Sequence, residues 1–338
     1  ETLFLPLLSD ASNTQSVYAA LQLIEALVQH EPAWFAQHRG VLHCLVALWS
    51  TPAMQALRRT EADVLATQHR LTPLFVALLH AALRVEPVVE AYMALLDLYT
   101  SSPSRDATHH TRFVYEQACV RADMATKRAL VQQCIQLVAD PGVPTVRKTY
   151  ALRVMVNPML VMEASTERVM TPELVQALAV QVWRQVQHGA GVYGDDELRV
   201  ELLQMSTLVL EHSADLLASE STTKMDAIKF GWSFLPLEDV TVKHAAYLLI
   251  SRFLQRFESP LKITGQVYVG LLRLPPNDGR GLVRRALDIL VPALPERVPS
   301  TDSTSPPLWV KWTKRTLLDE GHYALQLCTI LQLIVRYA

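Results

Sequence analysis

The sequence predicts an all-α protein, an α-solenoid of about seven antiparallel helix pairs. Three observations predict this fold class. Apolar residues recur with the period of a helix almost from end to end, whereas alternating runs of strand length are nearly absent. The breaks between the periodic stretches are short. Glycine supplies only 11 of 338 residues, less than half its usual share of about 7%, and sheet proteins with many tight turns need glycine for positive φ.

Four apolar stretches define helical faces most clearly. Within each stretch the residues follow steps of three and four, which is the template for one buried face of a helix. The stretches are Val17, Leu21, Ile24 and Val28; Tyr247, Ile250, Leu254 and Phe257; Val283, Leu287, Leu290 and Leu294; and Leu327, Ile330, Leu331, Ile334 and Val335. Pro32, Pro52, Pro73 and Pro87 fall between such patterns, and a proline in the first turn of a helix costs little.

Short polar side chains stand where helix N-termini need a cap. We expect caps at Asn13, Asp140, Thr171, Asp195, Asp239 and Asp278. The one longer polar loop runs from Pro295 to Pro307. Together these signals predict roughly fourteen helices joined by short turns.

A short pattern, Asp-x-x-Val-Lys/Arg-x-x-Ala, occurs once closely and twice loosely. The copies are Asp239, Val242, Lys243 and Ala246; Asp278, Val283, Arg284 and Ala286; and Asp140, Val146, Arg147 and Ala151. The three valines are separated by 96 and then 41 residues, about two units and one unit of a 40–47-residue period. We expect the aspartate to cap the helix or reach a basic residue of a neighbouring repeat, the valine to face the core and the alanine to allow close packing. The pattern resembles the second helix of HEAT repeats and favours a solenoid over a globular helical bundle.

Charge and hydropathy exclude several classes of protein. The chain has 31 basic and 33 acidic residues, a net charge of −2, and 50% hydrophobic residues. This composition excludes a disordered tail and a nucleic-acid binder driven by bulk charge, so we expect no direct nucleic-acid binding. The longest apolar stretch, 74–85, is interrupted by His80 and Arg84 and is shorter than the ~20 residues that a bilayer needs, so we expect no membrane partner.

Four cysteines, Cys44, Cys119, Cys134 and Cys328, lie in apolar helical stretches and none forms a C-x-x-C pair. Disulfide scaffolds are short and dense in cysteine, so we interpret these four as reduced, buried thiols of an intracellular protein. The chain begins at Glu1 without a signal-peptide pattern, and residues 331–338 still follow an apolar helical pattern. We therefore expect an internal segment of a longer polypeptide.

One glycine motif could suggest a nucleotide site. Gly189, Gly191 and Gly194 spell G-x-G-x-x-G, but a dinucleotide site needs a strand before this motif. A predicted helix, 174–188, precedes it, and the acidic run that begins at Asp195 would repel a pyrophosphate. We interpret the motif as a glycine C-cap, a turn and an acidic helix start.

Other motifs also fail to indicate chemistry. His109 and His110 are adjacent, beside Asp106 and near Cys119, but adjacent side chains on a helix point apart, which does not suit zinc. We interpret the pair as a loop or a helix start. The chain has no nucleophile elbow and no phosphate loop. We therefore predict no enzyme activity and no catalytic, cofactor-binding or metal residues.

A mixed aromatic and basic stretch lies near the C-terminus. On a helix, Trp309, Trp312 and Thr316 would face one way, which indicates a buried stripe rather than stacking on nucleic acid. The basic side chains that point largely away, together with two from the preceding repeat, form a candidate protein-interaction surface: Arg284, Arg285, Lys311, Lys314 and Arg315. This surface could gather acidic segments of transcription activators; the alternative is an ordinary solvated surface.

Several segments resemble a known family. They are Phe230-Gly231-Trp232, Leu237-Glu238-Asp239, Gln266 to Arg273, Leu282 to Arg297, Trp309 with Trp312 to Arg315, Glu320-Gly321-His322 and Gln332 to Val335. In this order and spacing they resemble the central HEAT region of the TRRAP family, the transcription-associated pseudokinases of the PI3-kinase-related kinase class. The segment from Lys148 to Met162 looks similar too. The match is specific from about Ala227 onward and diffuse before Arg147; the first 140 residues carry only helical periodicity.

The resemblance implies a scaffold. Members of this family carry a long HEAT solenoid, a FAT domain and a kinase-like domain that lacks catalytic residues, and they serve in SAGA-type histone acetyltransferase complexes in the nucleus, where they receive transcription activators. We expect residues 1–338 to form one continuous HEAT-like array without the FAT and kinase-like parts. Its expected partners are the other repeats of the same chain, acetyltransferase-complex subunits and acidic activators. The alternatives are a HEAT-repeat transport receptor or other cargo adaptor, and an enzyme with a catalytic set hidden in the first half.

Overall fold

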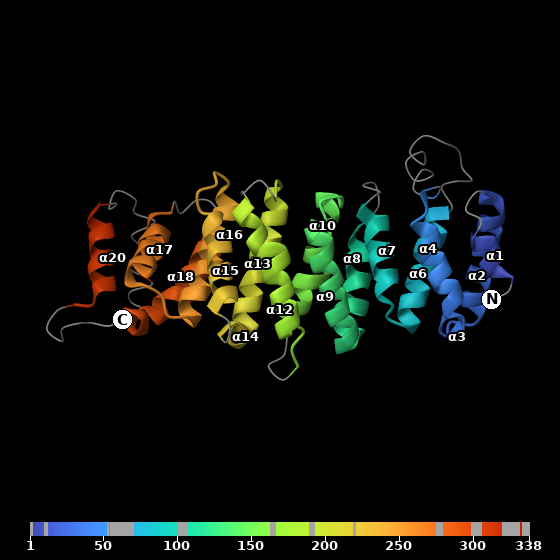
Figure 1. Cartoon of the computed structure of the whole chain (residues 1–338), viewed down its shortest axis with the longest axis horizontal. Coiled ribbons are helices and arrows are strands. Elements are labelled where there is room, and N and C mark those ends of the chain that lie inside the picture. Colours follow the sequence, from blue (N-terminus) through green and yellow to red (C-terminus); the bar gives the residue numbers. More distant parts are fainter. Residues whose placement is uncertain are drawn as a thin grey trace. The chain divides into compact units, whose positions relative to one another are not determined.

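The computed structural model describes residues 3–9, 13–52, 54, 71–100, 107–162, 167–188, 193–218, 221–274, 280–298, 306–319 and 332. Over these residues the chain is helical and contains no strand, which confirms the predicted all-α fold class (Figure 1). None of the described helices is both long enough and apolar enough to cross a bilayer. The chain divides into two compact units, unit 1 (Glu1–Cys134 and Val146–Met162) and unit 2 (Ile135–Thr145 and Glu163–Ala338).

Unit 1 is built from helices that pack against one another. They are α1 (Phe4–Ser9), α2 (Thr14–His30), α3 (Trp34–Gln37), α4 (Arg39–Trp49), α6 (Leu71–Val85), α7 (Val89–Thr100), α8 (Ala107–Val114) with the π-helical η2 (Tyr115–Arg121), and α10 (Thr145–Ala151) with the π-helical η3 (Leu152–Val156) and α11 (Asn157–Val161). α9 (Met124–Ala139) contributes residues to both units. α2 packs on α6, α1 on α4, and α7 on both α4 and α6.

The apolar faces of unit 1 lie where the helical period predicts them. Val17, Leu21 and Ile24 of α2 are completely buried. Asn13 caps the same helix, because its side-chain oxygen accepts a hydrogen bond from the Ser16 amide at 3.2 Å. Local sequence signals therefore place both the start and the buried face of α2.

A polar contact joins α10 to α7. Arg147 donates from Nη1 to Asp97 at 2.9 Å, and the Trp49 indole N–H donates to the other oxygen of the same carboxylate at 3.2 Å. This pairing corrects one prediction about the repeat pattern. Val146 was expected in the core but is 66% exposed. Successive side chains on a helix are rotated by about 100°, so α10 turns Val146 towards solvent when it points Arg147 at α7.

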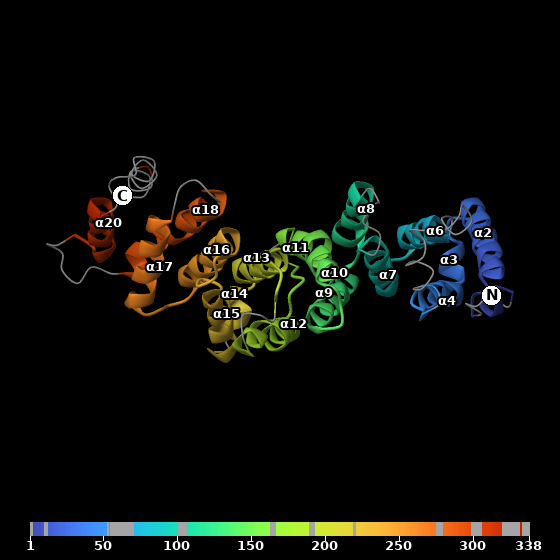
Figure 2. The ribbon, with the colours of Figure 1, turned by 90° about the horizontal axis from the view of Figure 1, so that it is seen from above.

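Unit 2 contains the remaining described helices. They are α12 (Pro172–Leu178) continued by η4 (Ala179–Trp183) and η5 (Arg184–His188), α13 (Asp196–His212), α14 (Ala214–Ala218), α15 (Ser221–Ser233), α16 (Val240–Arg256), α17 (Leu261–Arg273), α18 (Arg280–Leu290) continued by η7 (Val291–Ala293) and α19 (Leu294–Arg297), and α20 (Leu308–Asp319). Successive pairs place α13, α16 and α18 side by side, with α16 packed against the other two (Figure 2). We call these three helices the second-helix row.

Side-chain caps begin several helices of unit 2. Thr171, Asp195 and Asp239 accept hydrogen bonds from the backbone amides three residues later, as predicted. The prediction for Asp140 was wrong: its carboxylate accepts from the Gly142 amide at 2.8 Å in a turn, and α10 begins only at Thr145. An aspartate that closes a turn in this way is not available to cap the next helix.

The closest copy of the repeat pattern behaves as expected. Val242 and Ala246 of α16 are completely buried, and Asp239 caps that helix. In the next copy, Ala286 is completely buried while Val283 lies half-buried at the edge of the core. The small alanines allow the close approach of the second-helix row, since α16 and α18 contact each other along their length.

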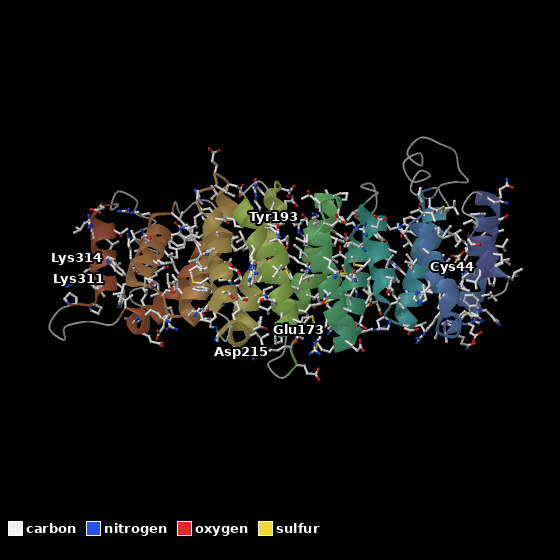
Figure 3. All side chains as sticks on the ribbon, in the orientation of Figure 1. Cys44, Glu173, Tyr193, Asp215, Lys311 and Lys314 are labelled. Atoms are coloured by element: carbon white, nitrogen blue, oxygen red, sulfur yellow. The ribbon has the colours of Figure 1, made fainter. Side chains whose placement is uncertain are left out.

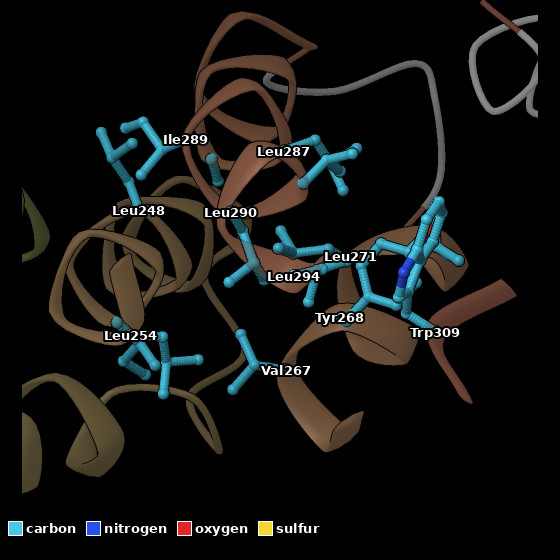
Figure 4. Packing of buried hydrophobic residues seen from close by; sticks show 14 of the residues in the cluster. Leu248, Leu254, Val267, Tyr268, Leu271, Leu287, Ile289, Leu290, Leu294 and Trp309 are labelled. Atoms are coloured by element: carbon cyan, nitrogen blue, oxygen red, sulfur yellow. The ribbon is translucent and has the colours of Figure 1, made fainter. Parts of the chain in front are cut away.

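One apolar cluster closes the C-terminal part of unit 2. It combines Leu248 and Leu254 of α16 with residues of α17, α18 and α20, and Trp309 forms its outer edge (Figure 4). Neighbouring repeats therefore share one core instead of each enclosing its own.

Some predictions fall on residues outside the described ranges. These are the cap at Asp278, the glycines at 189 and 191, Asp106, Cys328, most of the 295–307 loop and nearly all of the apolar helix expected at 323–337. Of the remaining cysteines, Cys119 and Cys134 are free and buried as predicted, while Cys44 is free but only half-buried.

Two glycines of unit 2 should respond in opposite ways to alanine. A Cβ at Gly231 would lie 3.0 Å from Leu249 Cδ2 and 3.1 Å from Ile250 Cγ1. The side chains of Leu249 and Ile250 are completely buried. We expect Gly231→Ala to lower the free energy of unfolding by about 1–2 kcal/mol through overpacking. Gly281→Ala, with no atom within 4 Å, should raise it by about 0.5 kcal/mol. Urea denaturation of both variants checks this; equal effects would contradict it.

A buried histidine, His110, and a half-buried one, His80, should make unit 1 sensitive to acid. The His110 ring stacks on Tyr99 at 3.3 Å between ring centroids, and His80 stacks on Phe113 at 3.9 Å. The two ring nitrogens of His110 have no hydrogen-bond partner, and Nε2 of His80 has none either. Burial lowers the pKa of His110 to about 3, with a smaller contribution from His80, and burial together with Arg84 lowers the pKa of His80 to about 4.

The sign of the pH effect follows from these shifts. Below pH ~6.5 the unfolded chain binds protons that the folded chain does not, so stability should fall by up to about 1.4 kcal/mol per pH unit for each histidine as the pH drops towards 4. We expect His110→Phe to flatten the dependence of the urea midpoint on pH between 7.5 and 5. The exposed neighbour provides a matched control, and His109→Phe should leave the slope intact. Identical slopes in both variants would refute the assignment.

Candidate protein-interaction surface

The five predicted surface residues lie on two helices that both pack against α17. On α18, Leu287 and Leu290 are buried in the shared core. Arg284 and Arg285 lie on the opposite side, with 71% and 54% of their side chains exposed. The amphipathic pattern of this helix therefore positions two arginines away from the core.

α20 shows the separation of faces that its sequence predicts. Trp309 is 8% exposed and Thr316 is 2% exposed. Lys311, Lys314 and Arg315 are exposed, and both lysines lie on the side of α20 away from α17 in Figure 3. Because the Trp309 ring is buried, it cannot stack on a base, which agrees with the prediction of a structural aromatic stripe.

A hydrogen-bond chain fixes the rotation of α20. The Thr313 hydroxyl donates to the Trp309 carbonyl at 2.8 Å, so the Tyr268 hydroxyl of α17 donates to Thr313 Oγ1 at 2.7 Å. Nearby, the Trp312 ring lies over the backbone of Gly265, where a Cβ would come within 3.0 Å of the ring. These contacts hold one face of α20 on α17 and leave the basic face outward.

Two of the arginines make only weak contacts on their own helices. Arg284 lies 3.9 Å from the Asp288 carboxylate, and Arg315 lies 3.7 Å from that of Asp319. Exposed ion pairs of this length contribute about 0–1 kcal/mol. With Lys311 and Lys314, they supply four exposed cations that can exchange their present contacts for those of a partner.

Arg285 belongs to a different network. Its Nη2 lies 3.4 Å from Glu211 Oε2, and Arg252 of α16 contacts the other oxygen at 2.9 Å. Arg256 donates to the backbone carbonyl of Glu211 at 2.9 Å. Burial lowers the pKa of Arg252, and the negative charge of Glu211 raises it. The positive charges of Arg256 and Arg285 add to the lowering. Arg285 thus serves the packing of the second-helix row and is the least available member of the predicted surface.

Sequence reasoning did not identify Glu211, Arg252 or Arg256. Glu211 and Arg285 are 74 residues apart, and no local pattern connects residues two repeats apart. A signal could come only from aligning the repeats with one another, and the weak similarity between repeats does not provide that alignment.

The motifs considered for chemistry have structural roles where they are described. Asp195 caps α13, and Asp196 and Glu197 occupy its first turn, where negative charge is favourable. His109 and His110 lie near the start of α8, as predicted, with His109 exposed and His110 buried. Across the described part of the chain, no three His, Cys, Asp or Glu side chains are arranged to hold a metal ion.

The described thiols are poorly suited to nucleophilic chemistry. Burial raises the pKa of Cys119 and of Cys134 to about 12, against smaller opposite effects of Lys127 and Arg147. Burial also raises the pKa of Cys44. The thiolate is the reactive form of cysteine, so all three side chains remain protonated near neutral pH.

Comparison with known proteins places these helices in a family. The family described as "Tra1 HEAT repeat ring region" matches residues 2–338. The chain is 28% identical over 354 residues to "Probable transcription-associated protein 1" of Dictyostelium discoideum, covering 98% of this chain and 8% of that protein. It is 24% identical over 339 residues to the human "Transformation/transcription domain-associated protein", covering 95% of this chain and 9% of that protein.

A shorter match of higher identity comes from yeast. Over 126 residues the chain is 38% identical to "SAGA complex/NuA4 acetyltransferase complex subunit TRA1" of Saccharomyces cerevisiae, covering 37% of this chain and 3% of that protein. The chain thus spans less than a tenth of the length of these three relatives. The family match covers nearly every residue, and the described helices form the stacked pairs that its description implies. The chain therefore belongs to the Tra1 HEAT repeat ring family.

Proposed function

We propose that residues 1–338 form one continuous HEAT-like array and act as a non-catalytic scaffold segment of a nuclear transcription coactivator. The observation that carries this proposal is the match of residues 2–338 to the Tra1 HEAT repeat ring region. A yeast relative is named as a subunit of the SAGA and NuA4 acetyltransferase complexes, which supports acetyltransferase-complex subunits as partners. These names favour a coactivator over the transport receptor or cargo adaptor that helical repeats alone would allow.

The described residues fit a scaffold. Their buried thiols are held in the unreactive form, and their polar contacts join one helix to another. An acetyltransferase complex would supply the chemistry, and this chain would supply surfaces that hold other proteins. The outward faces of stacked helices are well suited to this role, because they form extended binding surfaces.

The scaffold role is tested on the intact assembly. When the polypeptide that carries this chain is affinity-purified from nuclear extract, histone acetyltransferase activity should co-purify and should disappear when the polypeptide is depleted. A free polypeptide with no associated acetyltransferase, found mainly outside the nucleus, would contradict the proposal.

Within this function, the exposed cations of α18 and α20 could receive acidic segments of transcription activators. We expect Lys311→Glu with Lys314→Glu to weaken binding of an acidic activator segment roughly 2- to 30-fold at low salt, because each exposed charge pair contributes about 0.2–1 kcal/mol. The salt dependence of binding should also become shallower. Lys229→Glu with Lys262→Glu gives the matched control, since both lysines are exposed. Fluorescence anisotropy at two salt concentrations measures the change, and equal binding by both pairs of variants would dispose of this site.

A further inference from the structure

The strongest unassigned feature is an open groove in unit 1. It has a volume of about 530 Å³ and lies between α8 with the start of η2 on one side and η3 with α11 on the other. Tyr115, Val154 and Pro158 provide its apolar lining, and Arg112 and Arg153 stand at its edge. None of these residues belongs to the candidate surface on α18 and α20.

One wall of the groove contains the π-helical η3, and the sequence explains this turn. The other wall is mostly α8, to which η2 adds Tyr115. Residues 145–161 form one helical run through α10, η3 and α11. Pro158 lacks an N–H, and its ring would collide with the carbonyl four residues earlier, at Val154. The wider π-turn from Leu152 to Val156 accommodates the proline inside the run.

The opposite wall supports this widened turn. The Cys119 thiol of η2 points at the carbonyls of Val154 and Met155, at 3.9 Å and 3.7 Å from Sγ. η2 and η3 are therefore held together by a buried contact. Single π-turns inside α-helices occur frequently at functional sites, and η3 is such a turn.

Large apolar side chains remain exposed on η2, in the groove, and at the end of α11. Tyr115 is 39% exposed, and Val161 and Met162 at the end of α11 are 58% and 45% exposed. The Tyr115 hydroxyl donates to Met162 Sδ at 3.2 Å. Clustered apolar exposure of this kind marks a surface that a partner covers.

The charge around the groove selects the kind of partner. The groove lining includes two basic residues, Arg112 and Arg153, and no acidic one. Arg112 is 79% exposed and forms an ion pair with Glu116, one turn further along the chain. A second copy of the same face would bring arginines against arginines, so like-charge repulsion disfavours self-association here.

We propose that this groove binds an acidic peptide segment of another protein that carries one large apolar side chain. The apolar side chain would pack against Val154 and Pro158 beside Tyr115, and carboxylates on either side of it would pair with Arg112 and Arg153. An apolar anchor in a pocket supplies most of the affinity in such interfaces, and the surrounding charges supply attraction and orientation.

A synthetic peptide on the full chain tests this site. The probe is a fluorescein-labelled peptide of about twelve residues, ~40 Å when extended, with a central Phe-Leu pair among aspartates. We expect it to bind with a Kd below about 1 mM. Replacing Phe-Leu by Ser-Ser in the peptide should weaken binding at least about tenfold, and so should Arg112→Glu with Arg153→Glu in the protein. Circular dichroism at 222 nm verifies that each variant is folded.

A matched control separates the groove from bulk charge. Arg121→Glu with Arg128→Glu makes the same change in charge within residues 107–162 at exposed positions outside the groove lining. This pair should bind the probe within about threefold of the unaltered chain. Thr108→Trp, which fills the groove without changing its charge, should abolish binding. Absence of binding to the unaltered chain, equal loss in both charge-reversal pairs, or full binding by the Ser-Ser peptide or by Thr108→Trp would each overturn the proposal.

Discussion

The carboxylate of Glu211 joins the three helices of the second-helix row, α13, α16 and α18. It receives Arg252 at 2.9 Å and Arg285 at 3.4 Å, while Arg256 caps its backbone carbonyl. Arg252 is only 9% exposed, so its charge needs the opposite charge of Glu211: removing one partner of a buried ion pair costs about 3–5 kcal/mol. The shared core between α16 and α18 depends on the same alignment, because Leu248, Ile289 and Leu290 meet only when the two helices keep this register.

Contacts of this type recur at about the length of one repeat in both units. Arg147 reaches Asp97 in unit 1, 50 residues away, and Arg184 reaches Asp226 in unit 2, 42 residues away. Arg297 caps the carbonyl of Gln255, also 42 residues away, as Arg256 caps that of Glu211. A single helix pair cannot bury both of its faces, so each repeat is stabilised by the next one. This construction leaves the outward helix faces and the grooves between neighbouring helices available for other proteins, which is what a scaffold requires.

Local signals predicted the local structure well. The spacing of apolar residues identified the buried face of α2, Asp239 marked the start of α16, and the stripe of Trp309 and Thr316 set the rotation of α20. Contacts between repeats could not be predicted, since Glu211 and Arg285 are 74 residues apart. For the same reason Val146 was expected inside: only the pairing of Arg147 with Asp97 turns it outward. The groove in unit 1 could not be predicted, because it depends on how α8 and η2 pack against η3 and α11, and Pro158 alone does not reveal that Cys119 lies opposite η3.

Hydrogen exchange of the Glu211→Gln variant, followed by mass spectrometry, tests most directly whether neighbouring repeats are joined by such contacts. The variant keeps the shape of the side chain and removes its charge, and Glu238→Gln, at an exposed position, is the control. If Glu211 holds the second-helix row together, amide hydrogen exchange in α13, α16 and α18 should accelerate roughly a hundredfold, which corresponds to about 3 kcal/mol. The amides of α2 and α6 in unit 1 should stay as protected as in the unaltered chain. Unchanged protection of α16 and α18, or an equal loss of protection in both units, would contradict the account.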